Sequence, residues 1–434
     1  MYLTMRTVWL LTACCLLVLA VPRPLTVVVC TAGVTLLVVV DVIAAPSPHS
    51  LRVQRSVERS VRLGGSTTST LTVVNTGRRR AGARVRDAWP PSAGATRERA
   101  SLSVPAGERR RTRTVLTPTR RGDRQADLVT VRLEGPLGLA GRQASLLAPA
   151  RLRVLPEFAS RRHLPSRFAR LREMDGRSAV MIRGAGTEFD SLREYVVGDD
   201  VRSIDWRSTA RRGEVVVRTW RPERDRRVLI VVDTGRMAAA RLGDAPRLDA
   251  HIEACLLMAA LASRAGDRVD VIALDVAVRA QVRGQSGAAL MSALADALAP
   301  LDAELVETDW TLLASAVRRA LSQRALVVVL TALDGSGGEA PMVRALGSVA
   351  QDHVVVLASP TDPGLAELRA GRADSEVVYT AAAAERDVVE LDRVRGRLRR
   401  RGVEVVEAEP GALPPALADA YLALNYTLST VLTS

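Results

Sequence analysis

The second half of this sequence alternates continuous apolar runs with segments of helical periodicity, and this alternation restricts the fold more than any other feature. Continuous apolar runs of this length are typical of parallel strands that are buried on both faces. Five such runs occur, at residues 228–232, 269–274, 325–330, 354–357 and 403–406. Helical spacing occupies residues 248–265, 288–298, 312–321, 342–350 and 381–401. We therefore expect a doubly wound α/β domain over residues 228–434.

The carboxyl ends of these predicted strands are the expected place for a site, because ligands of doubly wound sheets bind beyond those ends. Polar side chains are available there: Asp233 follows the first strand, and Thr331 and Asp334 follow the third. We treat these three residues as candidate site residues.

The N-terminal residues 1–45 contain two apolar stretches, 7–21 and 25–45, on either side of a Pro-Arg-Pro turn. The second has the roughly 20 apolar residues that a membrane span requires. We expect two transmembrane helices and hence a multi-pass protein of the cell membrane; a cleavable signal peptide followed by one anchor is the alternative. Either arrangement places the large domains in the cytoplasm, as the many later arginines also indicate. Asp41 lies four residues from the end of its stretch, which favours an interfacial position over an intramembrane functional site.

Residues 46–155 change to short runs rich in β-branched residues, separated by turn signals such as Asn75-Thr76-Gly77 and Gly135-Pro136. The runs cover residues 67–74, 111–116, 127–133 and 144–154. Strands at this spacing predict a small immunoglobulin-like β-sandwich. Residues 156–227 then form a basic connector followed by a dense polar segment.

Charge is distributed unevenly along the chain. All 61 positive residues are arginines, and residues 46–150 hold 20 of them against 7 acids, a net charge of +13. A basic domain directly after a membrane anchor is expected to face anionic headgroups of the membrane lipid. Nucleic acid is not the expected partner, because only 3% of residues are aromatic and no zinc-finger spacing occurs. The four cysteines also lack metal-ligand spacing and are expected to be reduced.

The segment from residue 184 to 220 concentrates glycine, acids, arginines and tryptophan. Helical spacing predicts a short helix over residues 189–197, and Trp206 and Trp220 are expected to be apolar anchors near the sheet. Because arginine fits a carboxylate with two hydrogen bonds, we expect an Arg/Asp network. A recognition surface and a catalytic carboxylate pair are the alternatives. The candidate network or partner-binding residues are Glu188, Arg193, Asp199, Asp200, Arg202, Asp205, Trp206, Arg207 and Arg211.

This segment resembles the signature of the bacterial domain-of-unknown-function 58 family. The resemblance rests on Phe189, Gly198, Asp199, Asp200, Arg202, Ile204, Asp205, Trp206, Ala210 and Arg211, followed by a strand that ends in Asp233. Upstream, Arg121-Gly122 and the run Gly135-Pro136-Leu137-Gly138-Leu139 resemble the family's β domain. The resemblance implies a membrane-anchored protein with a von Willebrand factor A-like domain, in a family associated with MoxR-type AAA+ ATPases.

The A-domain resemblance also implies where a metal site would lie. Metal-binding members carry Asp-x-Ser-x-Ser after the first strand, a Thr from a later loop and an Asp after the fourth strand, all hard oxygen ligands. Here Gly235 and Met237 replace both serines beside Asp233, and Thr308 is the expected threonine, with Thr311 as the alternative. Ala332 stands where the second Asp is expected, with Asp334 two positions later. We expect a degenerate site with no metal and no cofactor.

Enzyme motifs are absent from the sequence: it contains no glycine-rich phosphate loop, no nucleophile elbow and no HExxH. The expected function is that of a membrane-anchored, non-enzymatic scaffold or adaptor whose A-like domain docks a protein partner, plausibly a MoxR-type AAA+ ATPase. The first alternative is binding of anionic lipid or nucleic acid through the basic β domain. A less favoured alternative is a hydrolase that uses Asp199, Asp200 and Asp205 and requires a carboxylate with a raised pKa.

Overall fold

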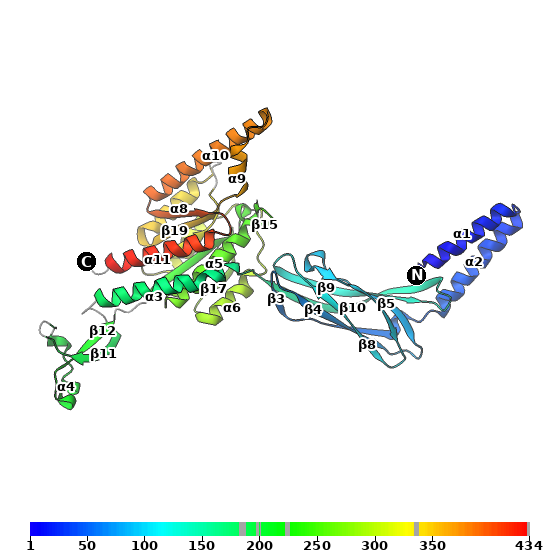
Figure 1. The fold of residues 1–434 in the computed structure, drawn as a ribbon, viewed down its shortest axis with the longest axis horizontal. Coiled ribbons are helices and arrows are strands. Elements are labelled where there is room, and N and C mark those ends of the chain that lie inside the picture. The colour runs from blue at the N-terminus through cyan, green and yellow to red at the C-terminus, as the bar shows by residue number, and fades with distance from the viewer. Residues whose placement is uncertain (182–187, 197–198, 200, 222–225, 334–337, 432–434) are drawn as a thin grey trace. The chain divides into compact units, whose positions relative to one another are not determined.

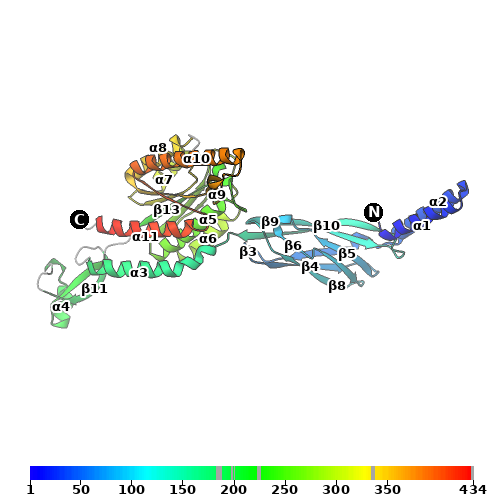
Figure 2. The ribbon, with the colours of Figure 1, turned by 45° about the horizontal axis from the view of Figure 1, so that its top comes forward.

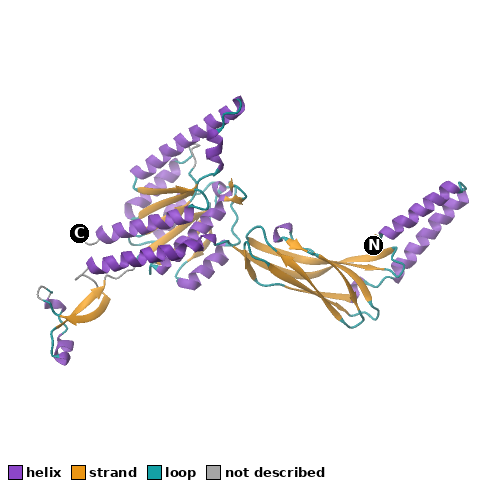
Figure 3. Ribbon diagram, viewed as in Figure 1, coloured by secondary structure: helices purple, strands orange, loops and turns teal. Residues whose placement is uncertain are grey.

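The computed structural model describes residues 1–434 except 182–187, 197–198, 200, 222–225, 334–337 and 432–434. The chain forms two compact units, Met1–Glu157 and Phe158–Ser434. The elements of each unit can be followed in Figures 1 and 2. Figure 3 shows a helical hairpin and mainly β-strands in the first unit, whereas the second mixes helices and strands along its length.

The first unit begins with a helical hairpin formed by α1 (Met5–Ala20) and α2 (Pro24–Ala44). The helical stretch Pro24–Ser50 is long and apolar enough to cross a membrane, whereas α1 is a shorter apolar helix. Large apolar side chains of α2 face outward without protein cover: Leu25 is 72% exposed and Leu36 is 63% exposed. The structure therefore has one helix near the N-terminus that could span a membrane by length and composition.

The rest of the first unit is a β domain made of two sheets. One has the order β1-β10-β9-β5-β7, with β3 beside β10, and the other has the order β2-β4-β8-β6. The bounds are β1 Tyr2–Leu3, β2 Leu51–Ser56, β3 Ser60–Arg62, β4 Thr67–Asn75, β5 Ala81–Asp87, β6 Ala95–Thr96, β7 Arg99–Val104, β8 Arg109–Leu116, β9 Gly122–Glu134 and β10 Ala140–Leu155. The predicted runs are confirmed as β4, β8, β9 and β10. The sequence analysis missed β5, which buries small alanines between arginines instead of a clear apolar run.

Asp41 connects the base of the helical hairpin, where α1 begins and α2 ends, to this β domain. Its buried carboxylate accepts hydrogen bonds from the N–H groups of Leu137, Leu139 and Ala140, at 2.7, 2.7 and 2.8 Å. These groups belong to the turn between β9 and β10. A Cβ on Gly135 would lie 2.2 Å from Asp41 Oδ1, so only glycine lets the turn approach this closely. Asp41 is therefore a structural contact between the hairpin and the β domain, which the sequence did not indicate.

A buried ion pair lies in the core of the β domain. The fully buried side chain of Arg55 donates from Nε to Asp87 Oδ1 at 2.8 Å. Asp87 also accepts from the Ser69 hydroxyl at 2.9 Å and from the Trp89 indole N–H at 3.2 Å. The terminal nitrogens of Arg55 donate to backbone carbonyls of β9 and β10, and its guanidinium lies 5.3 Å from the centroid of the Trp89 ring. The buried positive charge is thus both paired and hydrogen-bonded.

The second unit contains a six-stranded sheet in the order β17-β16-β13-β18-β19-β20. The bounds are β13 Arg227–Asp233, β16 Arg268–Leu274, β17 Val278–Val282, β18 Leu326–Leu330, β19 Val354–Pro360 and β20 Val403–Ala408. The five predicted apolar runs are confirmed as parallel strands of this sheet. The antiparallel edge strand β17 was not predicted, because four of its five residues are not fully buried and it shows no continuous apolar run.

Helices cover both faces of this sheet (Figure 1). Buried side chains of α5, α6 and α11 pack against one face, and those of α7, α8 and α10 pack against the other. The bounds are α3 Leu164–Met181, α5 Arg247–Arg264, α6 Gly287–Leu298, α7 Trp310–Ala320, α8 Ala340–Asp352, α9 Gly364–Ala370, α10 Ser375–Arg400 and α11 Leu413–Val431. The five predicted helices correspond to α5, α6, α7, α8 and α10, whereas α9 and α11 were not predicted.

Strand order identifies the switch point of the sheet. β13 comes first along the chain, with β16 on one side and β18 on the other. The chain continues from β13 into α5 on one face and from the adjacent β18 into α8 on the other face, and loops that diverge in this way open a crevice for ligands. Asp233 is the last residue of β13.

Candidate functional site

Asp233 lies at the switch point and is only 1% exposed. Its Oδ1 accepts hydrogen bonds from the Thr308 hydroxyl at 2.6 Å and the Gly235 N–H at 2.9 Å. Its Oδ2 accepts from the Thr331 hydroxyl at 2.6 Å. Burial raises the pKa of Asp233 above its usual value, the three hydrogen bonds oppose that rise, and the charge of Asp275 adds to it. We call Asp233, Thr308 and Thr331 the Asp233 cluster.

A second carboxylate borders the Asp233 cluster at the end of the neighbouring strand β16. Asp275 is fully buried, accepts from the Thr234 hydroxyl at 3.0 Å and pairs with Arg279 at 2.7 Å. Burial works against its charge, but the hydrogen bonds from Arg279, the Ala277 N–H and Thr234 prevail and lower its pKa. The sequence analysis did not single out Asp275, although it directly follows a predicted strand.

The loop before α7 closes over the end of β13. The N–H of Glu304 donates to the Thr234 carbonyl at 2.8 Å, and the N–H of Arg236 donates to the Val306 carbonyl at 2.8 Å. A Cβ on Gly235 would lie 2.3 Å from Thr308 Oγ1, so a serine there would force this loop away. The Arg236 side chain forms a surface ion pair with Glu307, at 2.6 Å. Met237 occupies a short 3-10 turn, where its carbonyl accepts from Arg247 at 3.0 Å.

The residues present do not fit a hard divalent ion. Of the metal-site positions, Asp233 and Thr308 are brought together as expected, but both threonine hydroxyls of the cluster donate to the one carboxylate. Ala332 is buried and contributes no oxygen ligand from its side chain. Asp334 lies outside the described residues. Within the described part of the chain, no group of three or more His, Cys, Asp or Glu side chains is arranged as a metal site.

We expect millimolar Mg²⁺ or Mn²⁺ to leave the melting temperature of the full chain unchanged. A ligand that binds only the folded state raises stability by RT ln(1 + [L]/Kd), and a carboxylate whose oxygens already accept three protein donors gives a high Kd. Differential scanning fluorimetry in detergent checks this. A rise of several degrees that disappears in Asp233→Asn would show that the cluster does bind the ion.

His251 lies on α5 and is fully buried. Among the described residues, neither of its ring nitrogens has a hydrogen-bond partner. Burial and the nearby charge of Arg247 lower its pKa to about 3, an effect that the backbone of Thr331 and Asp233 offsets in part. The imidazole is therefore neutral at physiological pH and packs beneath the end of the sheet.

The dense polar segment forms a separate small structure, which we call the hairpin module (residues 188–221). Instead of the predicted helix over residues 189–197, β11 (Glu188–Glu194) pairs antiparallel with β12 (Val216–Arg221). The helix prediction was wrong because the apolar spacing fits either period in so short a run, and the valine-rich partner strand decides between them. Val216 and Val217 are each 2% exposed, so both faces of β12 are covered at these two positions.

Two Arg/Asp pairs hold the hairpin module together. Asp199 accepts two hydrogen bonds from the guanidinium of Arg193, at 2.8 and 2.6 Å. Asp205 caps α4 (Trp206–Arg212), accepting from the Ser208 N–H at 2.9 Å, and its other oxygen accepts from Arg218 at 2.7 Å. The Ser208 N–H and then Arg218 lower the pKa of Asp205, although burial works against this. The expected Arg/Asp network is present, but its described pairs use Arg193 and Arg218.

The other predicted residues of this segment have different placements. Arg202 lies in a short 3-10 turn, Val201–Ser203, and Arg207 and Arg211 lie exposed on α4. Glu188 pairs through its backbone with Arg221, and Asp200 lies outside the described residues. Trp206 is 68% exposed, so the expectation that it anchors the fold is wrong. The side chain of Trp220 is not among those described.

Replacing Asp205 with Ala should loosen α4 selectively. The change removes the cap and the partner of Arg218, so amide exchange in Thr209–Gly213 should accelerate by roughly an order of magnitude, the usual effect of losing such a cap. Hydrogen exchange read by mass spectrometry checks this. Asp205→Asn keeps an oxygen that can cap, so its exchange should remain close to that of the wild type. Equal exchange in all three proteins would show that the cap does not support α4.

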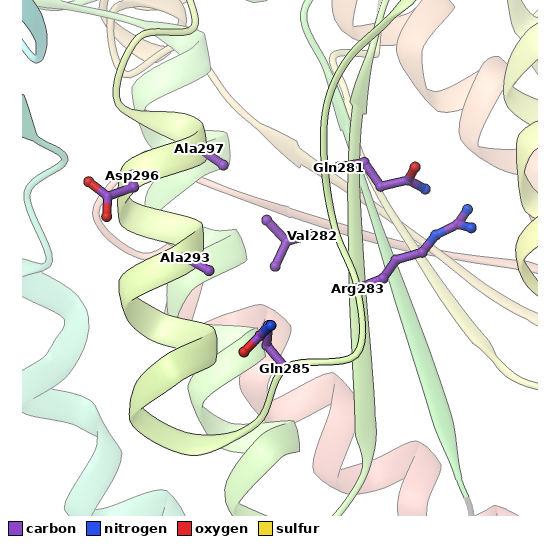
Figure 4. A pocket seen from close by; sticks show the side chains of 7 residues that line it. All are labelled: Gln281, Val282, Arg283, Gln285, Ala293, Asp296 and Ala297. Atoms are coloured by element: carbon purple, nitrogen blue, oxygen red, sulfur yellow. The ribbon is translucent and has the colours of Figure 1, made fainter.

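A hollow of about 430 Å³ lies away from both of these places, between β17 and α6. In Figure 4, Ala293 and Ala297 of α6 face Val282 of β17, whereas the Asp296 side chain points away from that strand. The other lining residues of the hollow are Gln281, Arg283 and Gln285, and the seven residues include no thiol and no imidazole.

Fold and site together define a chain with one apolar N-terminal helix of membrane-spanning length, a two-sheet β domain and a mixed α/β unit with a polar cluster at its switch point. The chain belongs to the family described as Protein of unknown function DUF58, whose match covers residues 191–409. This range runs from the hairpin module to the last strand of the sheet.

Similar proteins include two without a described function. Uncharacterized protein Rv1480 of Mycobacterium tuberculosis and Uncharacterized protein Mb1516 of Mycobacterium bovis are each 26% identical over 190 residues, which is 43% of this chain and 59% of each relative. The chain therefore matches little more than half the length of these relatives.

Two solved structures show weak likeness. The CARDB domain of PF1109 from Pyrococcus furiosus is 17% identical and covers 24% of this chain and 94% of its own, with a TM-score of 0.19. The conserved hypothetical protein BatB from Bacteroides thetaiotaomicron is 14% identical and covers 46% of this chain and 98% of its own, with a TM-score of 0.28.

Proposed function

We propose that this protein is a membrane-anchored, non-enzymatic adaptor whose second unit docks a protein partner, and that the partner is a MoxR-type AAA+ ATPase. The observation that carries the proposal is the exposed tryptophan of the hairpin module, presented on a short basic helix that two Arg/Asp pairs hold in place. The ATPase is named because the signature residues of this segment resemble those of a family associated with such ATPases.

The surface of the hairpin module has the composition of a docking site. Trp206 is 68% exposed, and Val196 and Val201 are 61% and 62% exposed. Residues 206–213, which comprise α4 and its C-terminal glycine, contain three arginines and no acid. Tryptophan and arginine are the residues most enriched among interface hot spots. A partner with an acidic surface around an apolar pocket fits this patch.

The sheet of the second unit supports an A-like fold as part of this proposal. The order β17-β16-β13-β18-β19-β20 places Asp233 at the switch point, where A-like domains carry their ligands. Here Thr308 and Thr331 close on that carboxylate. We infer that this domain docks its partner without a bridging metal ion, because the hydroxyls of Thr308 and Thr331 already donate to the two carboxylate oxygens of Asp233.

The geometry supports the hydrolase alternative less than it supports the adaptor. A carboxylate that acts as a general acid needs a raised pKa, whereas the pKa of Asp205 is lowered by the Ser208 N–H and Arg218. Both oxygens of Asp199 accept hydrogen bonds from the guanidinium of Arg193. Both described carboxylates of the proposed catalytic set are thus held by donors within the hairpin module.

We further propose that α1 and α2 both enter the membrane, so that the protein is multi-pass and the large units are cytoplasmic. The tight turn between the helices, with Arg23 at its tip, supports a hairpin that returns the chain to its starting side. Burial of both helices in lipid would cover the apolar side chains that they leave exposed.

The adaptor proposal is tested by direct binding of purified proteins. The full chain in nanodiscs is titrated with a purified MoxR-type AAA+ ATPase from the same cells, with and without ATP, and binding is followed by biolayer interferometry. Saturable binding that weakens as salt rises would support the proposal, since rim charges make association salt-dependent. No binding in any nucleotide state would reject this partner.

A further inference from the structure

We propose that the end of the β domain nearest the helical hairpin binds phosphate groups of anionic phospholipids. The binding surface is an arginine rim, which consists of Arg78, Arg79, Arg80, Arg109 and Arg111. This inference concerns the first unit alone and is independent of the function proposed for the second.

Strand register places these arginines at one end of the domain. Arg78, Arg79 and Arg80 lie in the β4–β5 loop, and Arg109 and Arg111 lie in the first residues of β8. β4 ends at Asn75, which pairs with Leu51 at the start of β2, so the β4–β5 loop lies beside the exit from α2. The β7–β8 loop joins them, because the Gly107 N–H donates to the Asn75 carbonyl at 2.9 Å. The β9–β10 turn is at the same end, since Ala83 near the start of β5 pairs with Leu133 near the end of β9.

The helical hairpin starts from this same end. The N–H of Thr4 donates to the Leu139 carbonyl at 2.9 Å, and Asp41 binds the N–H groups of the same turn. Because α2 has 21 residues, it is about 31 Å long, which matches the roughly 30 Å hydrocarbon core of a bilayer. With α2 across the membrane, the base of the hairpin lies at the boundary of the hydrocarbon, and the arginine rim lies at the level of the headgroups.

The arginine rim lacks counter-charges from the protein. All five side chains are exposed, and within residues 1–157, which the structure describes completely, none forms an ion pair. The acids of this end are already engaged: Glu108 pairs with Arg110 at 3.0 Å, Glu134 pairs with Arg84 at 2.8 Å, and Asp41 accepts three N–H groups. Phosphate oxygens of the membrane would supply the missing negative charge, and guanidinium groups bind them in a bidentate manner.

A hollow beside the rim supplies further phosphate-binding groups. It measures about 420 Å³, and Ser47, His49, Arg142 and Gln143 are among its lining residues. Arg142 Nε donates to the Val42 carbonyl in the last turn of α2, at 3.0 Å. This bond fixes a guanidinium next to the point where α2 would leave the bilayer. A headgroup phosphate entering the hollow could therefore be met by a guanidinium and a hydroxyl together.

The test measures which lipid surrounds the base of the hairpin in the full chain. Trp9 in α1 is 69% exposed and lies near that base, so brominated lipids beside it quench its fluorescence. The chain is reconstituted in phosphatidylcholine vesicles with phosphatidylglycerol, with one or the other lipid brominated, and a Trp9→Phe variant gives the background. We expect brominated phosphatidylglycerol to quench more than its mole fraction predicts.

Removing the rim charges should abolish this preference. Each arginine near an anionic surface contributes about fivefold to association, so the triple variant Arg78→Gln, Arg79→Gln, Arg80→Gln should lower the relative association constant of phosphatidylglycerol by tenfold or more. The matched control Arg59→Gln, Arg97→Gln, Arg120→Gln removes the same charge at the opposite end of the domain and should keep the preference. If the rim variant does not fold, Arg109→Gln, Arg111→Gln replaces it.

Three results would overturn the proposal: equal quenching by both lipids in the wild type, an unchanged preference in both rim variants, or an equal loss in the control triple. Soluble glycerol phosphate at constant ionic strength distinguishes a bilayer from a free phosphate. It should leave the preference unchanged if the rim binds a lipid surface, and complete competition by millimolar glycerol phosphate would reject the bilayer as the source of the ligand.

Discussion

Trp206→Ala should weaken partner binding by about thirtyfold or more and leave folding stability within about 0.5 kcal/mol of the wild type. The side chain is 68% exposed, so its removal costs the fold little packing. In a complex, however, an exposed indole on a basic helix would become buried, and buried tryptophans at interface centres typically contribute about 2 kcal/mol or more. Binding of the AAA+ ATPase to the full chain in nanodiscs gives the affinity, and thermal unfolding gives the stability.

A matched control comes from the same unit. Tyr379 on α10 is 78% exposed, so Tyr379→Ala removes an equally exposed aromatic side chain outside the hairpin module. Its affinity for the partner should match that of the wild type. Equal affinity of Trp206→Ala and wild type would exclude the hairpin module as the docking surface, and a large loss of stability in Trp206→Ala would show that the side chain packs against another part of the chain.

Asp87→Ala should destabilise the β domain by about 3–5 kcal/mol, because it leaves the guanidinium of Arg55 buried without a counter-charge. Arg55 keeps its bonds to backbone carbonyls, but these carry no net charge. The Ser69 hydroxyl and the Trp89 indole N–H also lose their acceptor. Native-state hydrogen exchange of the amides in β4, β5 and β9 should accelerate by at least about a hundredfold, which reports the lowered free energy of opening the domain.

Glu108→Ala serves as the control for this change. Its ion pair with Arg110 belongs to the same domain, but both side chains are 50% exposed. Exposed pairs contribute little, so exchange in the same strands should change less than about threefold. If Asp87→Ala were as mild as Glu108→Ala, the Arg55 charge would have to be solvated or neutralised by other groups, and the buried pair would not hold the core together.

Local sequence was sufficient to predict the strands that are buried along most of their length. The apolar runs that became β13, β16, β18 and β19 are buried on both faces along most of their length, whereas the edge strand β20 buries Val403 and Val405 and exposes Glu404. Composition therefore distinguishes the four central runs from their surroundings. The same reasoning placed Asp233 at a strand end, and the resemblance to A-like domains added Thr308, whose hydroxyl donates to Asp233. Counting apolar residues also gave residues 25–45 as long enough to span a membrane, and the helical stretch Pro24–Ser50 meets that test of length and composition.

Residues that act through distant partners could not be assigned in this way. Asp41 is separated by about a hundred positions from the turn whose N–H groups it binds, and Asp87 is 32 positions from Arg55. In the hairpin module, pairing with β12 makes residues 188–194 a strand instead of the predicted helix. Trp206 of the same module is exposed. Periodicity describes which face of an element is apolar, whereas strand pairing and charge pairing depend on which segments the fold brings together. The sequence by itself thus determined the class of the sheet and the carboxylate at its switch point, and the tertiary structure decided which arginine each buried carboxylate binds and which side chains remain exposed for a partner.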